Sequence, residues 1–348
     1  MKSYQRSVLV VAPNWLGDAV MSLPLIGCLS AAPGLRLTVM APPYTARVFS
    51  CLDEVGDLIV LPKTGPFRGL TRRSRTIRRI ACDGGVLLPP SFSSALSLFV
   101  SGVRCRVGYA ADGRGFLLSE PVPSTKLREE HLSENYLRLG RRLLARLELA
   151  DVQAPVRPVL KVFAAERESV AKMLRSHGAP AVNYAVVVPG AAYGPTKSWP
   201  AEKYRRLATM LSKEVPVVLA GSPGDRALCD SISRDVTGVV NLAGLTSLGE
   251  FFALLATARV VVANDSGAPH VAGSLGVPTV VIFGSTSPRW TKPLGPHVVV
   301  VREHVHCSPC FLRECPTQLE CYRGIEPGRV FDIALGSMNK AVEAVPRV

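Results

Sequence analysis

Residues 259–283, RVVVANDSGAPHVAGSLGVPTVVIF, decide the fold class. Two apolar runs, Arg259–Ala263 and Thr279–Phe283, flank a segment with a helical pattern. Neither run alternates apolar with polar residues, and continuous apolar runs are typical of strands buried on both faces of a parallel sheet. A strand, a helix and a second strand of this kind form a βαβ unit. The stretch therefore predicts an α/β domain.

The same alternation of apolar runs and helical patterns continues along the rest of the chain. Further strands are predicted at Ser7–Ala12, Arg36–Met40, Asp57–Leu61, Gly85–Leu88, Arg104–Gly108, Tyr184–Val188, Val215–Ala220, Gly238–Asn241 and His297–Val301. A charged helical stretch and a proline-bearing segment near residues 150–160 divide these runs into two series. We therefore expect two Rossmann-like, doubly wound parallel-sheet domains, residues 1–160 and 161–348, that face a cleft.

The composition is that of a globular protein, and its charge narrows the class of partner. Of the residues, 47% are hydrophobic and 20% are charged, with a formal net charge of +14. Such a basic chain favours nucleic acid, an anionic membrane surface or phosphorylated substrates. The sequence has no zinc-finger spacing, RNP-like aromatic motif or coiled-coil basic region, so we expect no nucleic-acid partner. A single glycine after the first apolar run disfavours a nicotinamide enzyme.

The N-terminal stretch has some features of a targeting signal. It begins with basic residues and an apolar run, and LIGC (Leu25–Cys28) resembles a lipoprotein processing site. Pro13, Asn14, Gly17 and Asp18 interrupt the apolar region that a signal peptide requires. No run reaches the ~18 apolar residues of a membrane span. We therefore expect a cytosolic protein whose cysteines are reduced unless they bind metal.

The stretch VVVPGAAYGPTKSWP (186–200) resembles a nucleotide-binding loop but is not a P-loop. Its two glycines, Gly190 and Gly194, are too close together, and Lys197 does not directly follow the second one. Pro195 also removes a backbone N–H donor. Two alternatives remain: an ordinary βα loop with a surface lysine, or a lysine that serves the phosphates of another ligand.

Several segments together resemble the ADP-heptose:lipopolysaccharide heptosyltransferases (glycosyltransferase family nine), and the heptosyltransferase II branch most of all. The specific one is NDSGAPHVAGSLGVPTVVIFGSTSPRWTKPLG (264–295). The others are VLVVAPNWLGDAVMSLPLI (8–26), LPPSFSSALSLFVSGVRCRVGY (88–109), HLSENYLRL (131–139) and PTKSWPAEKYRRLA (195–208). The resemblance therefore covers nearly the whole chain.

The resemblance implies a GT-B architecture, with the acceptor on the N-terminal domain and the nucleotide sugar on the C-terminal one. It also implies a C-terminal helix that packs back on the first domain. The implied reaction is an inverting transfer of L-glycero-D-manno-heptose from ADP-heptose to the heptosyl-Kdo-lipid A inner core, adding the second heptose. We expect no cofactor, and a cytoplasmic location with peripheral association at the anionic inner membrane. The alternatives are another heptose position or nucleotide sugar, and a non-catalytic sugar-nucleotide-binding protein.

The resemblance assigns the catalytic and substrate-binding residues. Asp18 matches the family's general base, and Gly17 beside it lets the backbone approach the sugar closely. Lys197 matches the lysine that stabilises the departing diphosphate, with Thr196 in the same site. Asp225 stands where the family has an acidic ribose contact, although an ordinary loop-surface aspartate is an equal alternative.

The DSG segment predicts a phosphate site at a helix N-terminus. A helix that begins after Asp265, Ser266 and Gly267 would direct its free N–H groups at the same phosphates. Ser266 would cap this helix or donate to phosphate, and these two roles are compatible. His270, one turn inside, would contact phosphate or ribose. The order Asp, Ser, His does not indicate a hydrolase triad, because the three residues lie on one strand–helix turn.

A run of arginines, RGLTRRSRTIRR (68–79), contains no acidic residue. One interpretation is a solvated helix face. The functional interpretation assigns Arg72, Arg75 and Arg79 to the phosphates and Kdo carboxylates of the acceptor, or to the anionic surface of the inner membrane.

A cysteine-rich segment, residues 304–321, has one C-x2-C pair. The candidate ligands of a structural zinc ion are Cys307, Cys310, Cys315 and Cys321. The second pair does not repeat the zinc-ribbon spacing. Structural cysteines, either reduced or paired in disulfides, are therefore the alternative.

Overall fold

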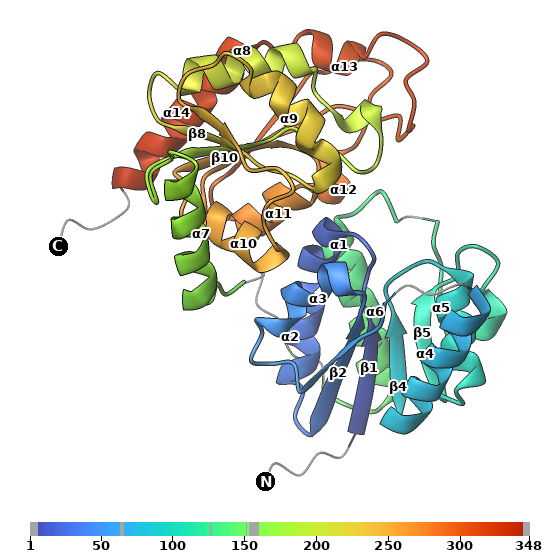
Figure 1. The fold of residues 1–348 in the computed structure, drawn as a ribbon. Coiled ribbons are helices and arrows are strands. Elements are labelled where there is room, and N and C mark those ends of the chain that lie inside the picture. Colours follow the sequence, from blue (N-terminus) through green and yellow to red (C-terminus); the bar gives the residue numbers. More distant parts are fainter. Residues whose placement is uncertain (1–5, 63–65, 126, 151, 153–159, 344–348) are drawn as a thin grey trace. The chain divides into compact units, whose positions relative to one another are not determined.

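The computed structural model describes residues 6–62, 66–125, 127–150, 152 and 160–343. The chain divides into two compact units, Met1–Val159 and Leu160–Val348. Each unit contains one parallel six-stranded sheet flanked by helices, so the predicted α/β fold of GT-B type is confirmed (Figure 1). Most of the linker predicted near residues 150–160 lies outside the described residues.

The first unit is a Rossmann-like sheet with strand order β3-β2-β1-β4-β5-β6. Its strands are β1 (Arg6–Val11), β2 (Leu35–Ala41), β3 (Asp57–Val60), β4 (Gly84–Leu87), β5 (Cys105–Tyr109) and β6 (Glu120–Val122). Its helices are α1 (Leu16–Met21), α2 (Leu23–Ala31), α3 (Pro43–Ser50), α4 (Pro66–Ile80), α5 (Phe92–Val100), the 3-10 turn η1 (Gly115–Leu117) and α6 (Leu132–Arg146). The strand order reverses between β1 and β4, where ligands of such sheets bind.

Strand β6 is the element that sequence analysis missed. It is short, contains Pro121 and pairs only with β5, where Pro121 lies opposite Gly108. Proline cannot donate to a ladder and is found on edge strands. Because β6 lies at the edge of the sheet, its proline is tolerated, although the same residue weakens the strand pattern in the sequence.

Two adjacent glycines of β4 show how the helices cover both faces of this sheet. A Cβ at Gly84 would lie 2.8 Å from Leu143 of α6, and one at Gly85 would lie 2.7 Å from Leu98 of α5. Successive strand residues point to opposite faces. Helices α6 and α5 therefore cover opposite faces. Helix α4 lies on the α5 side, because Ile77 shares a core cluster with Leu98.

The second unit repeats this topology, with strand order β12-β11-β10-β7-β8-β9. Its strands are β7 (Ala185–Val188), β8 (Val217–Leu219), β9 (Val239–Asn241), β10 (Val260–Asn264), β11 (Thr279–Phe283) and β12 (Val298–Arg302). Its helices are α7 (Ala164–Ser176), α8 (Ala201–Leu211), α9 (Arg226–Ser233), α10 (Leu248–Ala256), α11 (Gly267–Ser274), α12 (Pro288–Thr291), α13 (Glu320–Arg323) and α14 (Pro327–Glu343). The 3-10 turns are η2 (Pro195–Lys197) and η3 (Pro223–Asp225). The order reverses between β7 and β10.

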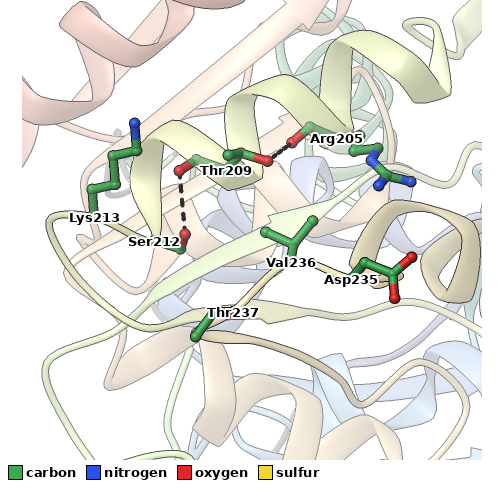
Figure 2. A pocket seen from close by; sticks show the side chains of 8 residues that line it. Arg205, Thr209, Ser212, Lys213, Asp235, Val236 and Thr237 are labelled. Atoms are coloured by element: carbon green, nitrogen blue, oxygen red, sulfur yellow. Dashed lines mark hydrogen bonds between the residues drawn. The ribbon is translucent and has the colours of Figure 1, made fainter.

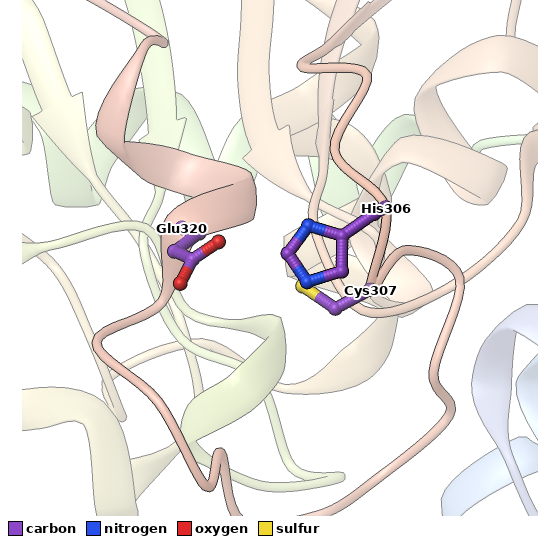
Figure 3. Close-up of side chains that lie close together, drawn as sticks. All are labelled: His306, Cys307 and Glu320. Carbon is purple, nitrogen blue, oxygen red and sulfur yellow. The ribbon is translucent and has the colours of Figure 1, made fainter.

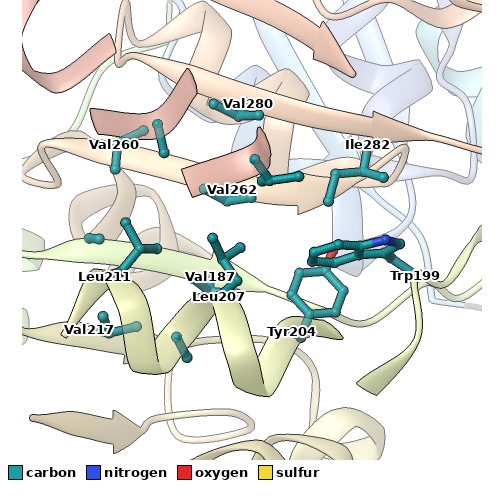
Figure 4. Packing of buried hydrophobic residues seen from close by; sticks show 14 of the residues in the cluster. Val187, Trp199, Tyr204, Leu207, Leu211, Val217, Val260, Val262, Val280 and Ile282 are labelled. Carbon is teal, nitrogen blue, oxygen red and sulfur yellow. The ribbon is translucent and has the colours of Figure 1, made fainter. Parts of the chain in front are cut away.

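The core of the second unit holds its C-terminal helix. Strand residues such as Val187 and Val262 pack with Leu207 of α8 and with Trp199 (Figure 4). The expected packing of α14 back on the first domain stays a prediction. The buried side chains of α14 belong to the core of the second unit: Val330, Ala334 and Met338. Among the described residues of either unit, no helix is both long enough and apolar enough to cross a bilayer.

Candidate active site

Lys197 and Asp265 meet at the point where the second sheet reverses its order. Lys197 ends the loop that follows β7, and Asp265 directly follows β10, the neighbouring strand. Lys197 Nζ lies 2.7 Å from Asp265 Oδ2, and their side chains are 15% and 3% exposed. An ion pair this well shielded has a fixed geometry and is screened little by salt. The ammonium is therefore held at the carboxyl ends of the strands, where a ligand would bind.

The Asp265 carboxylate is anchored by two threonines as well as by the lysine. Thr286 Oγ1 donates to Oδ2 at 2.6 Å, and Thr291 Oγ1 lies 3.3 Å from both carboxylate oxygens. Thr286 lies in the loop after β11, and Thr291 belongs to α12. Sequence analysis placed Asp265 among the phosphate-site residues and missed both threonines. Asp265 joins three loops of the site and orients Lys197.

A buried amide holds the lysine loop from the other side. Asn264 Oδ1 accepts from Trp199 N at 3.0 Å and from Tyr204 Oη at 2.8 Å, while its Nδ2 donates to Pro189 O at 2.6 Å. Asn264 thereby ties the start of the loop to the residues that follow Lys197. Its position directly before the DSG segment was the available sequence signal.

The loop is also tied to the cysteine-rich segment. Thr196 is buried and donates to Leu312 O at 2.5 Å, and Tyr193 Oη donates to Phe311 O at 2.8 Å. Gly194 has a φ of 152°, and a Cβ there would lie 2.9 Å from Arg313 O. Only glycine suits this backbone and this close approach. The hydroxyl of Thr196, predicted to contact substrate, thus holds two loops together.

Helix α11 begins beside this ion pair, as the DSG segment predicts. Ser266 occupies the N-cap position with extended backbone, but its side chain makes no capping hydrogen bond. Its hydroxyl oxygen is buried and has no hydrogen-bond partner among the described residues. Gly267 opens the helix, and the N–H groups of a first turn have no intrahelical acceptor. His270, one turn inside, is 2% exposed. The start of α11 therefore brings a buried hydroxyl and free backbone N–H groups beside Lys197, an arrangement that can bind an anion.

Asp225 lies against the lysine loop. A Cβ on Gly190 would lie 2.2 Å from Asp225 Oδ1, and one on Gly221 would lie 2.9 Å from its Cβ. Asp225 Oδ2 accepts hydrogen bonds from Ser222 N at 2.8 Å and from Ser222 Oγ at 2.7 Å. This carboxylate is half-buried and closes the turn before α9. Its other oxygen points toward the glycine after β7.

In the first unit, Asp18 stands in the first turn of α1, after β1 at the reversal point of the sheet. Asp18 is half-buried and Gly17 is buried. Burial raises the pKa of Tyr136 in α6 well above its usual value, and the neighbouring Asp18 carboxylate raises it further. Tyr136 therefore places a neutral phenol near Asp18. Sequence analysis missed this tyrosine, although its segment was part of the resemblance.

The three predicted arginines form one exposed stripe of α4. Arg72, Arg75 and Arg79 are exposed, and none of their guanidinium groups makes a salt bridge or hydrogen bond within the part of the chain that is described. The spacing of three and four residues places them on one side of the helix. Arg73 on the same helix differs from these three. Its Nε donates to Gly69 O at 3.3 Å, and burial lowers the pKa of its guanidinium.

The cysteine-rich segment has a different candidate ligand set from the predicted one. No disulfide joins any of the nine cysteines in the structure. His306, Cys307 and Glu320 bring one ligand atom each within 4.8 Å of one another (Figure 3). Among the described residues, the predicted set does not form such a group: Cys307, Cys310, Cys315 and Cys321. Cys321 instead belongs to the core of the second unit.

A separate pocket lies away from these residues. It is lined by Arg205, Thr209 and Lys213, and by the turn before β9 (Figure 2). Asp235, Val236, Thr237 and Gly238 form that turn, at the amino end of the strand. Ligands of doubly wound sheets bind at the carboxyl ends, so this pocket is not the active-site candidate.

Comparisons with known proteins agree with this geometry. Residues 70–320 match the model of glycosyltransferase family 9 (heptosyltransferase). The chain is 32% identical to lipopolysaccharide heptosyltransferase 2 of Escherichia coli K12, over 85% of this chain and 87% of that protein. It is 30% identical to lipooligosaccharide heptosyltransferase 2 of Haemophilus influenzae Rd, with coverage of 85% and 88%. The structure of E. coli ADP-heptose lipopolysaccharide heptosyltransferase II superposes with a TM-score of 0.80 at 27% identity, covering 97% and 99% of the two chains. The chain therefore belongs to glycosyltransferase family 9, the heptosyltransferases.

Proposed function

We propose that the protein transfers L-glycero-D-manno-heptose from ADP-heptose to heptosyl-Kdo-lipid A, adding the second heptose of the lipopolysaccharide inner core. Family membership and the similarity to heptosyltransferase 2 proteins over most of the chain support this assignment. The observation that carries it is the fixed Lys197–Asp265 pair beside the start of α11. It provides oriented positive charge and N–H donors for a leaving diphosphate.

On the donor side, the diphosphate lies between Lys197 and the first turn of α11. An ammonium has three donors, so Lys197 keeps protons for phosphate while it remains bonded to Asp265. The buried hydroxyl of Ser266 and the N–H of Gly267 add uncharged donors, and His270 reaches phosphate or ribose. Asp225 accepts from a ribose hydroxyl through the oxygen that faces Gly190.

On the acceptor side, Asp18 takes the proton of the attacking hydroxyl. One carboxylate suffices for a single displacement, because nucleophile and leaving group lie on opposite faces of the sugar. The reaction therefore inverts the anomeric configuration. Gly17 lets the sugar approach the backbone closely. Tyr136 stays protonated near Asp18 and keeps its surroundings free of a second negative charge.

The arginine stripe of α4 serves the acceptor. Arg72, Arg75 and Arg79 offer exposed guanidinium groups to the phosphates and Kdo carboxylates of the inner core, or to the anionic headgroups around it. The protein accordingly works at the cytoplasmic surface of the inner membrane as a peripheral protein.

The transfer uses no cofactor, since Lys197 and α11 supply the positive charge at the leaving group. A structural zinc ion in the cysteine-rich segment is a separate proposal. The ligand set that the geometry favours is His306, Cys307 and Glu320, which offer the nitrogen, sulfur and oxygen atoms that zinc accepts. Stoichiometric zinc in protein purified without chelator, lost in Cys307→Ser and retained in Cys310→Ser, is the expected result. Absence of zinc from the unaltered protein contradicts it.

The function is tested by ADP release from ADP-heptose, with and without Kdo-lipid A that carries one heptose. Release that requires this acceptor, with a product heavier by one heptose, is expected. Release that needs Kdo-lipid A without heptose would move the assignment to the first heptose. Tight ADP-heptose binding without release on any inner-core acceptor would favour a binding protein.

A further inference from the structure

Helix α5 exposes an apolar stripe that no charged residue interrupts. Its sequence, FSSALSLFV, contains neither acid nor base. Phe92 and Phe99 follow the spacing of one helix face and Val100 adjoins them, while Leu96 between them is partly buried against the core. Phe92 is 42% exposed, Phe99 47% and Val100 37%. Ala95 and Leu98 on the opposite side are fully buried against the sheet.

The cationic helix α4 lies beside this stripe. Ser101 Oγ donates to Ser74 O at 3.2 Å, and a guanidinium nitrogen of Arg78 donates to Val100 O at 2.6 Å. Both helices cover the same face of the sheet, so their outward sides belong to one surface (Figure 1). The outward residues of α4 include Arg75 and Arg79. An apolar strip and an arginine strip therefore run next to each other.

Further aromatic and basic groups extend the apolar strip at both ends. The ring of Phe116, which is 73% exposed, lies 6.1 Å from that of Phe92. The guanidinium of Arg106 lies 5.2 Å from the ring centre of Phe99. Large exposed aromatics flanked by arginines are typical of protein surfaces that enter the headgroup region of a bilayer.

We propose that this surface, the outward sides of α4 and α5 with Phe116, docks the enzyme on an anionic bilayer. Phe92, Phe99 and Phe116 enter the boundary between headgroups and acyl chains, while the arginines of α4 bind lipid phosphates. The inference deepens the proposed function, because the acceptor proposed there is itself a membrane lipid. A nucleic acid would bind the arginines but leave the apolar stripe exposed to water. A bilayer contacts both strips, so their proximity favours lipid as the partner.

The test is sedimentation of the full-length protein with phosphatidylcholine vesicles that contain 0% or about 30% phosphatidylglycerol. One variant is Phe99→Ser/Phe116→Ser, and a second is Arg75→Gln/Arg79→Gln. Matched controls on the second unit are Phe163→Ser, at a phenylalanine that is also 47% exposed, and Arg234→Gln, at an exposed arginine. Donor and acceptor are omitted, so vesicle binding is measured whether or not the protein is a heptosyltransferase.

Both double variants should bind anionic vesicles more weakly, while the controls bind as the unaltered protein does. Each arginine that is replaced should weaken the affinity for anionic vesicles about fivefold, which corresponds to the contribution of one basic residue near an anionic surface. The phenylalanine double variant should bind these vesicles about tenfold more weakly, because two partly buried rings no longer contribute to binding. Unchanged binding of the phenylalanine variant, or equal binding to vesicles without phosphatidylglycerol, overturns the proposal. So does a dimer that the phenylalanine variant dissociates, since a second copy would then cover the surface.

A second readout separates docking from catalysis. The Phe99→Ser/Phe116→Ser variant should keep its kcat/KM on a soluble inner-core oligosaccharide without acyl chains. On the same acceptor embedded in anionic vesicles, its kcat/KM should fall about as far as its vesicle affinity. Equal losses on both acceptors would show that these residues act in the site or in folding, and would overturn the docking role.

Discussion

Lys197 Nζ lies 2.7 Å from Asp265 Oδ2, and the aspartate is nearly inaccessible to solvent. The lysine is thus oriented by a carboxylate that is itself fixed by Thr286 and Thr291. A flexible four-carbon side chain is converted in this way into a fixed point charge. Its orientation depends on the partner as much as on the lysine.

Replacement Asp265→Asn should therefore impair catalysis through Lys197. The amide is uncharged and has one acceptor oxygen where the carboxylate has two, so the ammonium is held less firmly at the leaving group. We expect kcat to fall about 10²–10³-fold, the range found when one preorganised donor is removed. Steady-state kinetics measure it. Thr291→Val removes only the longer contacts at 3.3 Å and should cost far less. Equal losses in the two variants would contradict the orienting role.

Ser266→Ala separates ligand binding from helix capping. The Ser266 hydroxyl makes no cap hydrogen bond, so its removal should leave the melting temperature unchanged. Affinity for ADP, measured by calorimetry, should fall about tenfold, as for one hydrogen bond to a charged group. A loss of stability of about 1 kcal/mol, typical of a lost cap, with unchanged ADP affinity would reverse the assignment.

Gly190→Ala should introduce a specific clash with Asp225. The added Cβ would lie 2.2 Å from Oδ1, so the carboxylate must move. Overpacking of this kind costs about 1–3 kcal/mol of stability. Gly328→Ala, where a Cβ meets nothing within 4 Å, is the control for glycine loss. In the double variant Gly190→Ala/Asp225→Ser, the shorter side chain should restore much of the stability. Additive losses in a double-mutant cycle would argue against this contact.

Asp18→Asn should slow turnover strongly while donor affinity persists. The amide is nearly isosteric but cannot accept the proton of the acceptor hydroxyl. A general base typically raises the reaction rate about 10²–10⁴-fold. We expect kcat to fall within that range and the dissociation constant for ADP-heptose to remain within about twofold. Unchanged kcat would remove Asp18 from the mechanism.

The cysteines should differ in their rates of alkylation. Hydrogen bonds with Thr317 and with backbone groups lower the pKa of Cys315, whereas burial and neighbouring thiols raise that of Cys321 to about 11. Burial raises the pKa of Cys229 to about 12. A lower pKa gives a larger thiolate fraction at neutral pH, and the thiolate is the reactive form. Mass spectrometry after brief iodoacetamide treatment at pH 7.5 should find Cys315 modified first. Equal labelling of Cys321 in the folded protein would contradict this order.

The strands of both sheets were predictable because their side chains are buried on both faces. A run such as Val260–Ala263 predicts a buried strand by itself, without any knowledge of the strands that it pairs with. The same holds for Ser266 and Gly267, which follow a strand and open a helix. Sequence reasoning failed where a residue acts through partners distant in the chain. Thr286 and Thr291 matter only because they reach Asp265, more than twenty residues away.

Tyr136 and the group around Cys307 were missed for the same physical reason. The phenol near Asp18 is contributed by α6, far along the chain, and no local pattern marks it. Cysteine spacing suggested four ligands, and it does not mark the histidine and the glutamate whose ligand atoms lie close to Cys307. Spacing restricts which residues can meet, whereas the packing of a neighbouring core decides which of them do.

The hydrogen bonds from Thr196 to Leu312 and from Tyr193 to Phe311 have a consequence for recombination between relatives. Residues 193–197 and 311–313 form one module, although more than a hundred residues separate them in the chain. A chimera that exchanges only the cysteine-rich segment would present a foreign backbone to the loop that carries Lys197. Crossover points that keep both segments from one parent should yield active hybrids far more often than points that divide them.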